Sequence, residues 1–302
     1  MLRLPMALNN RILICGKNFH ARAAFRKLRA MPDAGQVIVF IDTQSASTNS
    51  DFMGLPVFDL ADLENSSFDQ IVLAGRYADE MQKLLVERAI PNGKIKEMKR
   101  SDYQPTQGQL APRSEQTKAI LVPLLKLLNG LDINYWFLAS SLLAIERNQD
   151  LAWFGDVDIA IPFESMTILS NALEGSSQFA LVKKRHQSHD GPFWQAGSLY
   201  QIVLRSESDI IESEPAIFDL HALYFHEGHA YYAAGNAGFL SADQRHFLGA
   251  ETTQFSGMDL RVPLDRHEYL SSTYGPEWYT PSESFRASDH IGRKSWSKSL
   301  KS

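Results

Sequence analysis

Short apolar runs alternate with helix-like segments through the first hundred residues, and this pattern restricts the fold more than any other feature. The runs occupy residues 11–16, 36–42, 54–58 and 69–75, and amphipathic segments follow at residues 19–30 and 77–89. Continuous apolar strands that alternate with helices are typical of a parallel sheet covered on both faces. We therefore expect an α/β protein with a parallel sheet in its N-terminal part, residues 1–100.

A polar stretch at residues 101–116 interrupts this pattern. It contains Pro105 and Pro112 and has no periodicity, so we interpret it as a linker. The length of 302 residues favours two domains. Residues 117–285 mix helices and strands and are expected to form an α+β domain, and residues 286–302 read as a basic tail. Strands are predicted at residues 151–161, 179–185, 200–205, 216–225 and 229–233.

Composition excludes several classes of protein. The formal charge of -5 argues against a general nucleic-acid binder. The single cysteine, Cys15, excludes an internal disulfide and any multi-cysteine zinc site, and its apolar surroundings predict a buried thiol. We find neither an apolar segment of about 20 residues that would span a bilayer nor a signal peptide, and we expect a cytoplasmic protein.

The segment Gly155-Asp156-Val157-Asp158-Ile159 carries the clearest chemical signal. On a strand, Asp156 and Asp158 would project from one face. Two neighbouring carboxylates repel each other, and a Mg²⁺ or Mn²⁺ ion removes that cost. The alternative is a pair of solvated aspartates on a half-exposed strand.

A second acidic strand strengthens the first reading. Asp219 and His221 share one face of an apolar strand, and aspartate is depleted inside strands. Asp219 as a third metal ligand would suit phosphoryl or nucleotidyl transfer, and His221 would help to deprotonate an acceptor hydroxyl. The alternative for Asp219 is an ion pair with a nearby basic residue.

Small residues begin a predicted helix just before the acidic strand. Ser140 and Ser141 stand where backbone N–H groups and hydroxyls can hold a phosphate, and Arg147 follows about two turns later. An ordinary buried helix start is the alternative. Small residues, a helix and then an Asp-x-Asp strand form the pattern of the nucleotidyltransferase superfold.

These segments resemble the LicD and fukutin-related family. Residues 140–147, SSLLAIER, are similar to its Gly-Thr-Leu-Leu-Gly-x-x-Arg motif, and residues 153–158, WFGDVD, to its Trp-Asp-Asp-Asp-x-Asp motif. Residues 218–220 match its internal aspartate strand, and residues 262–278 resemble its C-terminal motif of Val-Pro, Tyr-Leu, Tyr-Gly and Trp. The resemblance covers about residues 115–285.

The resemblance implies a nucleotidyltransferase-fold enzyme that moves a phospho-alcohol group, such as phosphocholine or ribitol phosphate, from a CDP-linked donor to a glycan hydroxyl. It assigns catalysis and metal binding to Asp156, Asp158 and Asp219. It assigns the donor phosphates to Ser140, Ser141 and Arg147, and the substrate pocket to Tyr269, Tyr274 and Trp278. The sequence departs from the family motifs at two places. Ser140 replaces the family glycine, and Phe154 and Gly155 replace the first two aspartates after the tryptophan, which we call the outer acids.

Two rival functions remain open. An NTP-dependent nucleotidyltransferase of the antibiotic-modifying type shares the Asp-x-Asp strand and the preceding helix. A degenerate, non-catalytic binding protein of a polysaccharide pathway would suit the missing outer acids.

The N-terminal part is similar to the start of a Rossmann-type unit, with Gly16 after its first strand and Asp42 at the end of its second. The later glycines of the dinucleotide fingerprint are absent. The run GLPV at residues 54–57 echoes small N-terminal domains of some sugar-modifying enzymes. We expect a structural or sensing module for a nucleotide or sugar phosphate, with Lys17 and Asn18 near a small anion.

Overall fold

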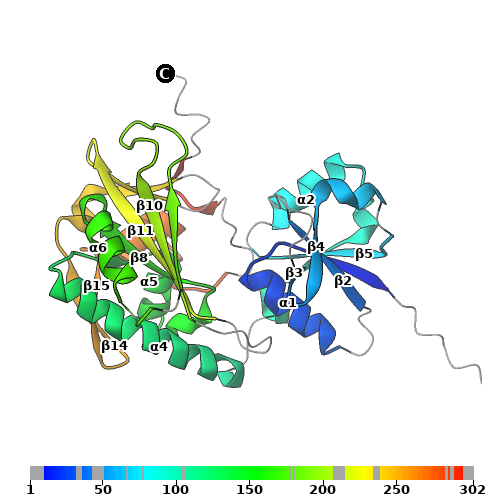
Figure 1. The fold of residues 1–302 in the computed structure, drawn as a ribbon, viewed down its shortest axis with the longest axis horizontal. Coiled ribbons are helices and arrows are strands. Elements are labelled where there is room, and N and C mark those ends of the chain that lie inside the picture. Colours follow the sequence, from blue (N-terminus) through cyan, green and yellow to red (C-terminus); the bar gives the residue numbers. More distant parts are fainter. Residues whose placement is uncertain are drawn as a thin grey trace, which may run out of the picture. The chain divides into compact units, whose positions relative to one another are not determined.

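The chain forms two compact units, each with its own sheet and hydrophobic core (Figure 1). Unit 1 holds residues 1–106 and 282–286, and unit 2 holds residues 107–281 and 287–302. The computed structural model describes residues 10–31, 36–42, 51–65, 67–75, 78–103, 107–176, 178–179, 181–206, 215–233, 239–282, 285 and 289–294. Within these ranges, no helix combines the length and the apolar character needed to cross a membrane.

Unit 1 contains a six-stranded sheet in the order β3-β4-β2-β1-β5-β6. Its strands are β1 (Arg11–Cys15), β2 (Gln36–Asp42), β3 (Asp51–Phe52), β4 (Leu55–Asp59), β5 (Gln70–Ala74) and β6 (Ile95–Met98). All neighbours are parallel except the short β3, which pairs antiparallel with β4. The parallel sheet expected from the apolar runs is confirmed.

Helices lie on both faces of this sheet (Figure 1). The helical segments are α1 (Phe19–Arg29), η1 (Leu60–Asn65), α2 (Ala78–Glu87), η2 (Asn92–Lys94) and α3 (Arg100–Tyr103). Alternate residues of β1 point to opposite faces, so Ile12 and Ile14 pack with Phe25 of α1, whereas Leu13 and Cys15 join the core with Leu85 of α2.

Unit 2 is built on an eight-stranded mixed sheet in which β8 and β11 are parallel and the other pairs are antiparallel. Its main path runs β16-β13-β12-β11-β10-β9, with β8 beside β11 and β7 beside β8. The strands are β7 (Trp136–Phe137), β8 (Val157–Pro162), β9 (Leu181–His186), β10 (Leu199–Arg205), β11 (Ile217–His226), β12 (His229–Ala233), β13 (Phe239–Asp243) and β16 (Arg293–Lys294). A separate hairpin joins β14 (Glu251–Phe255) to β15 (Met258–Val262).

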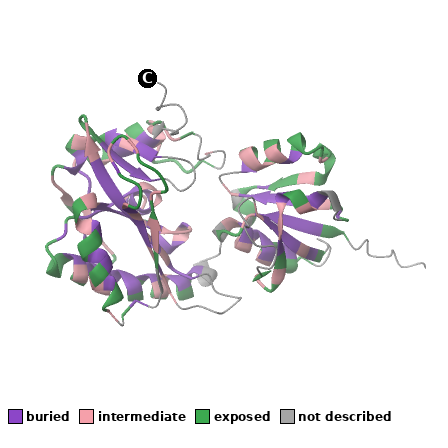
Figure 2. Ribbon diagram, turned by 45° about the horizontal axis from the view of Figure 1, so that its top comes forward, coloured by how far each residue is buried: buried purple, intermediate pink, exposed green. Residues whose placement is uncertain are grey.

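One face of the large sheet carries a row of fully buried apolar residues. Ile159, Ile202 and Leu220 occupy paired positions on three neighbouring strands and are fully buried. The helical segments are α4 (Gln107–Gly130), α5 (Ala139–Glu146), η3 (Leu151–Trp153), η4 (Phe163–Ser165), α6 (Met166–Glu174), η6 (Gln244–Phe247) and α7 (Arg266–Tyr274). Figure 2 shows the strands largely buried and the outward helix faces exposed. The alternate strand residues, Asp158 and Asp219 among them, therefore project from the opposite face.

Two boundaries differ from the sequence prediction. Residues 107–116, expected in the linker, form the first turns of α4, where Leu110 is buried and buried Arg113 donates to the Gly155 carbonyl. These tertiary contacts outweigh the helix-breaking tendency of Pro112. The strand expected at residues 151–161 starts only at Val157, because residues 151–153 form a 3-10 turn.

Other boundaries follow the sequence more closely. The hairpin between β11 and β12 is confirmed, and its turn residues Glu227 and Gly228 both have positive φ. Residues 293–294 of the predicted basic tail pair with β13, while residues 286–288 and 295–302 lie outside the described residues.

Candidate functional site

Asp158 and Asp219 are direct partners on the neighbouring parallel strands β8 and β11. Paired residues on adjacent strands present their side chains on the same face of the sheet. No strand lies between β8 and β11, so the two carboxylates lie side by side on that face. The sheet register thus unites two acids that are far apart in the sequence.

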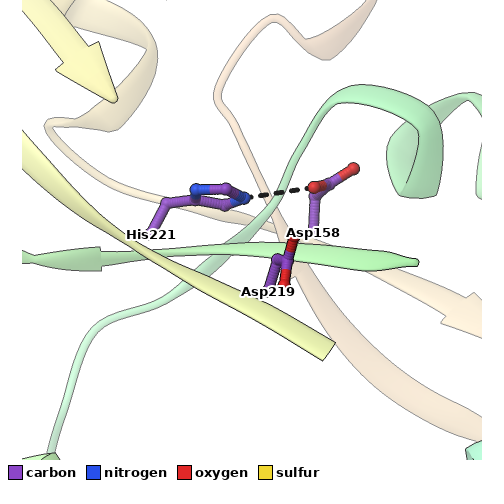
Figure 3. Close-up of side chains that lie close together, drawn as sticks. All are labelled: Asp158, Asp219 and His221. Carbon is purple, nitrogen blue, oxygen red and sulfur yellow. Dashed lines mark hydrogen bonds and ion pairs between the residues drawn. The ribbon is translucent and has the colours of Figure 1, made fainter. Parts of the chain in front are cut away.

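His221 completes this group from the next same-face position on β11 (Figure 3). Its Nε2 lies 3.1 Å from Oδ1 of Asp158. One possible ligand atom from each of Asp158, Asp219 and His221 lies within 4.8 Å of the other two. We call these three residues the acidic centre.

The acidic centre is shielded from water. The side chains of His221 and Asp158 are 6% and 14% exposed. Burial by itself lowers the pKa of His221. The hydrogen bond that protonated His221 donates to Asp158, with the negative charges of Asp158, Asp219 and Asp156, outweighs burial, so the pKa of His221 is raised.

The donor set suits a hard divalent cation. Two adjacent carboxylates supply the oxygen ligands that Mg²⁺ and Mn²⁺ prefer, and an imidazole nitrogen is a further ligand for Mn²⁺. The positive imidazolium is the alternative counter-charge for the pair. The Nδ1 atom of His221 is buried and, among the described residues, has no hydrogen-bond partner.

Asp156 stands apart from the acidic centre. It lies in the bend before β8, so the strand alternation that would align it with Asp158 does not extend to it. Its charge still acts on His221. The neighbouring Gly155 carbonyl accepts a hydrogen bond from Arg113, which the sequence analysis missed because this arginine lay in the expected linker.

The two serines at the start of α5 both contact Asp158. The hydroxyl of Ser140 donates to Oδ2 of Asp158 at 3.0 Å, and the buried Ser141 hydroxyl accepts from the Asp158 backbone N–H at 2.7 Å. The preceding residue, Ala139, has φ of 47°, a left-handed conformation that favours glycine. The helix start therefore fixes both the backbone and the carboxylate of Asp158.

Arg147 lies at the opposite end of α5 from Ser140. Its guanidinium donates to the backbone carbonyls of Trp278 and Thr280. The Trp278 ring is near His267, with centroids 5.5 Å apart. In this structure Arg147 and Trp278 thus join α5 to the turn after α7, and neither belongs to the acidic centre.

Tyr269 of α7 is fully buried, and the charge of Asp158 acts on it. Burial raises its pKa to about 12, and its hydroxyl interacts with the Ala139 backbone and lies 3.1 Å from the hydroxyl of Tyr232. Tyr274 packs on His290, with ring centroids 4.8 Å apart. Tyr232, whose ring is 6.0 Å from His221, was not singled out from the sequence because it falls in an apolar strand pattern.

In unit 1, the two residues expected near a small anion both have partners within the protein. Lys17 forms an ion pair with Asp42 at 3.1 Å, and Asn18 caps α1 by accepting from the Ala21 N–H. The His20 ring lies directly on Gly75, at the carboxyl ends of β1 and β5, because a Cβ atom built at Gly75 would be 2.6 Å from it. Gly75 lies at the switch point of the sheet, where doubly wound folds bind ligands.

No protein-family model and no curated protein matches the sequence. Among solved structures, the lincomycin-bound lincosamide antibiotic adenylyltransferase LnuA is 14% identical with a TM-score of 0.33, over 57% of this chain and 90% of that chain. A myo-inositol dehydrogenase from Corynebacterium glutamicum is 14% identical with a TM-score of 0.24, over 84% and 80%. GenD2 from gentamicin A biosynthesis, in complex with NAD, is 12% identical with a TM-score of 0.24, over 82% and 76%. At such low TM-scores these likenesses assign neither a fold nor a function.

Proposed function

We propose that unit 2 is a metal-dependent transferase of the nucleotidyltransferase type. In this proposal it moves a phospho-alcohol group from a CDP-linked donor to a hydroxyl of a cell-surface glycan. The observation that supports it most is the register pairing of Asp158 with Asp219 on the neighbouring parallel strands β8 and β11. The resemblance of residues 140–158 to the LicD and fukutin-related motif supplies the substrate class.

Asp158 and Asp219 would hold Mg²⁺ or Mn²⁺, with Asp156 contributing charge from the bend before β8. A bound cation would neutralise phosphate oxygens and stabilise the leaving group. Ser140 and His221 contact the two oxygens of Asp158, so we assign them the role of orienting that carboxylate.

The proposed reaction forms a bond between the acceptor oxygen and the phosphorus of the phospho-alcohol group. The bond from that phosphorus to the bridging oxygen of the donor breaks, and CMP leaves with the bonding electron pair. The proton of the acceptor hydroxyl passes to a base. Because Asp219 binds the metal in this arrangement, His221 at the next same-face position on β11 is the candidate for this base.

The test is a calorimetric titration of the whole chain with CDP-choline, CDP-ribitol, CDP-glycerol, CTP and ATP, each with Mn²⁺ and with EDTA. Metal-dependent binding of a CDP-alcohol that Asp158→Asn abolishes supports the proposal, and release of CMP in the presence of an acceptor completes it. Preference for an NTP with release of pyrophosphate indicates the nucleotidyltransferase alternative. Absence of metal-dependent nucleotide binding contradicts both enzymes and favours a binding protein.

A further inference from the structure

We infer that Lys183 and Arg185 on β9 form an anion-binding subsite for the phosphate or other anionic part of the substrate. The inference rests on the proposed function for the identity of that substrate. The subsite lies on β9 and β10, on the side of β11 away from β8. The family resemblance assigns no ligand to these two strands.

The strand register places these two cations on the same face as the acidic centre. On β10, Val203 pairs with Asp219 on one side and with Lys183 on the other. In the next row, Gln201 pairs with His221 and with Arg185. Side chains directly opposite each other share a face. Lys183 therefore lies in one row with Asp219, and Arg185 lies in one row with His221.

Gln201 links the two ends of the second row. Its side chain is 2% exposed, although glutamine is seldom fully buried. Its Oε1 accepts a hydrogen bond from Arg185 at 2.9 Å. The guanidinium of Arg185 is therefore held against β10, the strand between β9 and β11, and does not extend freely into solvent.

Within the described part of the chain, neither Lys183 nor Arg185 forms a salt bridge. The two positive charges stand two residues apart on one face, where they repel each other. A polyphosphate would satisfy both and, across about 10 Å of two strand spacings, would also reach a cation held by the carboxylates.

Protection of an exposed sheet edge is the competing explanation, because β9 is the last strand on its side of the sheet and edge strands often carry lysine. Lys184 provides the matched control. It projects from the opposite face, pairs with Ile202 and forms a salt bridge with Glu174 at 2.6 Å. It has the same charge on the same strand but no access to the acidic centre.

The experiment titrates tripolyphosphate into the whole protein in EDTA at low ionic strength, for the wild type, Lys183→Gln, Arg185→Gln, Arg185→Lys and Lys184→Gln. We expect each glutamine variant of the subsite to weaken binding about tenfold, since a charge-assisted hydrogen bond to phosphate is lost. Arg185→Lys should retain part of the affinity, and Lys184→Gln should match the wild type. Lys183 is exposed, so its substitution tests the subsite without a risk to folding.

Two results would overturn the inference: a wild type that does not bind tripolyphosphate, or a Lys184→Gln variant that loses as much affinity as Lys183→Gln. The proposed function is tested separately by Mn²⁺ binding to wild type and Asp158→Asn. Tripolyphosphate binding through Lys183 and Arg185 without Mn²⁺ binding would refute the metal-dependent function and support the subsite. If Mn²⁺ binds but neither Lys183→Gln nor Arg185→Gln changes the tripolyphosphate affinity, the metal site is supported and the subsite is refuted.

Discussion

Asp158 and Asp219 face each other across one strand spacing because β8 and β11 run parallel and in register. This pairing places two like charges in a shielded position beside His221. A protein tolerates such an arrangement when a cation or an imidazolium compensates the charges. The two explanations differ in whether the acidic centre binds Mn²⁺ from solution.

Asp158→Asn and Asp219→Asn are each expected to weaken Mn²⁺ binding by more than about 100-fold, because loss of a group that merely orients a ligand already costs about 10–100-fold. Calorimetric titration with Mn²⁺ measures the change. Asp259→Asn removes the same charge at an exposed position on β15 and should leave the affinity unchanged. Equal affinity in all four proteins would mean that the acidic centre is a structural ion pair.

Ser140 and Ser141 should have separable effects. Ser140→Ala removes a hydrogen bond to the Asp158 carboxylate and should weaken Mn²⁺ binding by about 10–100-fold with little change in stability. Ser141→Ala removes the acceptor for the Asp158 backbone N–H and should lower the free energy of unfolding by about 1–3 kcal/mol. Urea unfolding and Mn²⁺ titration of both variants give the two readouts. The interpretation fails if Ser140→Ala loses stability but not Mn²⁺ affinity.

The backbone at Ala139 offers an independent test of the helix start. Its φ of 47° costs an alanine about 1–2 kcal/mol relative to ordinary backbone, and glycine avoids most of that cost. Ala139→Gly should therefore raise the free energy of unfolding, or leave it unchanged where the added freedom of the unfolded chain offsets the gain. Ala144→Gly, in the buried interior of the same helix, should lower it by about 1 kcal/mol or more. Equal losses in both variants would contradict the left-handed conformation.

The fold was readable from the sequence where local pattern decides it. The continuous apolar run of β1 follows from burial on both faces, and the shared face of Asp219 and His221 follows from the period of a strand. The pairing of β8 with β11 depends on sheet topology, which no local pattern encodes. The start of β8 was misplaced because Leu151 and Ala152 look strand-like, whereas the Asp150 carboxylate caps a 3-10 turn there.

The helical start of α4 shows the same limit. Pro112 and the surrounding polar residues predict a linker, whereas Arg113 is buried in a helix and donates a hydrogen bond to the distant Gly155 carbonyl. Gln201 is a case where a signal was present. A glutamine within the apolar segment at residues 199–205 needs a partner, but the sequence does not show that Arg185 lies on the adjacent strand.

Cys15 is expected to be chemically inert in the folded protein. Burial and the charge of Asp42 raise the pKa of its thiol from 9.0 to about 12, so the reactive thiolate is absent at pH 8. Since Cys15 is the only cysteine, a thiol reagent such as dithiobisnitrobenzoate should react with no group in the native protein and with one equivalent in urea. Reaction of the native protein at the rate of a free thiol would contradict this placement.

The same pKa change predicts how stability depends on pH. The folded state keeps the thiol neutral and the unfolded chain ionises near pH 9.0, so this contribution is fully present below pH 9. It is lost as the pH rises from 9 toward 12, at a rate that approaches about 1.4 kcal/mol per pH unit. Urea unfolding at pH 8 and pH 10 for wild type and Cys15→Ala isolates the effect, because the alanine variant has no thiol to ionise. The wild type should lose more stability between the two pH values than Cys15→Ala, and equal losses would show that the thiol is not shielded in the folded state.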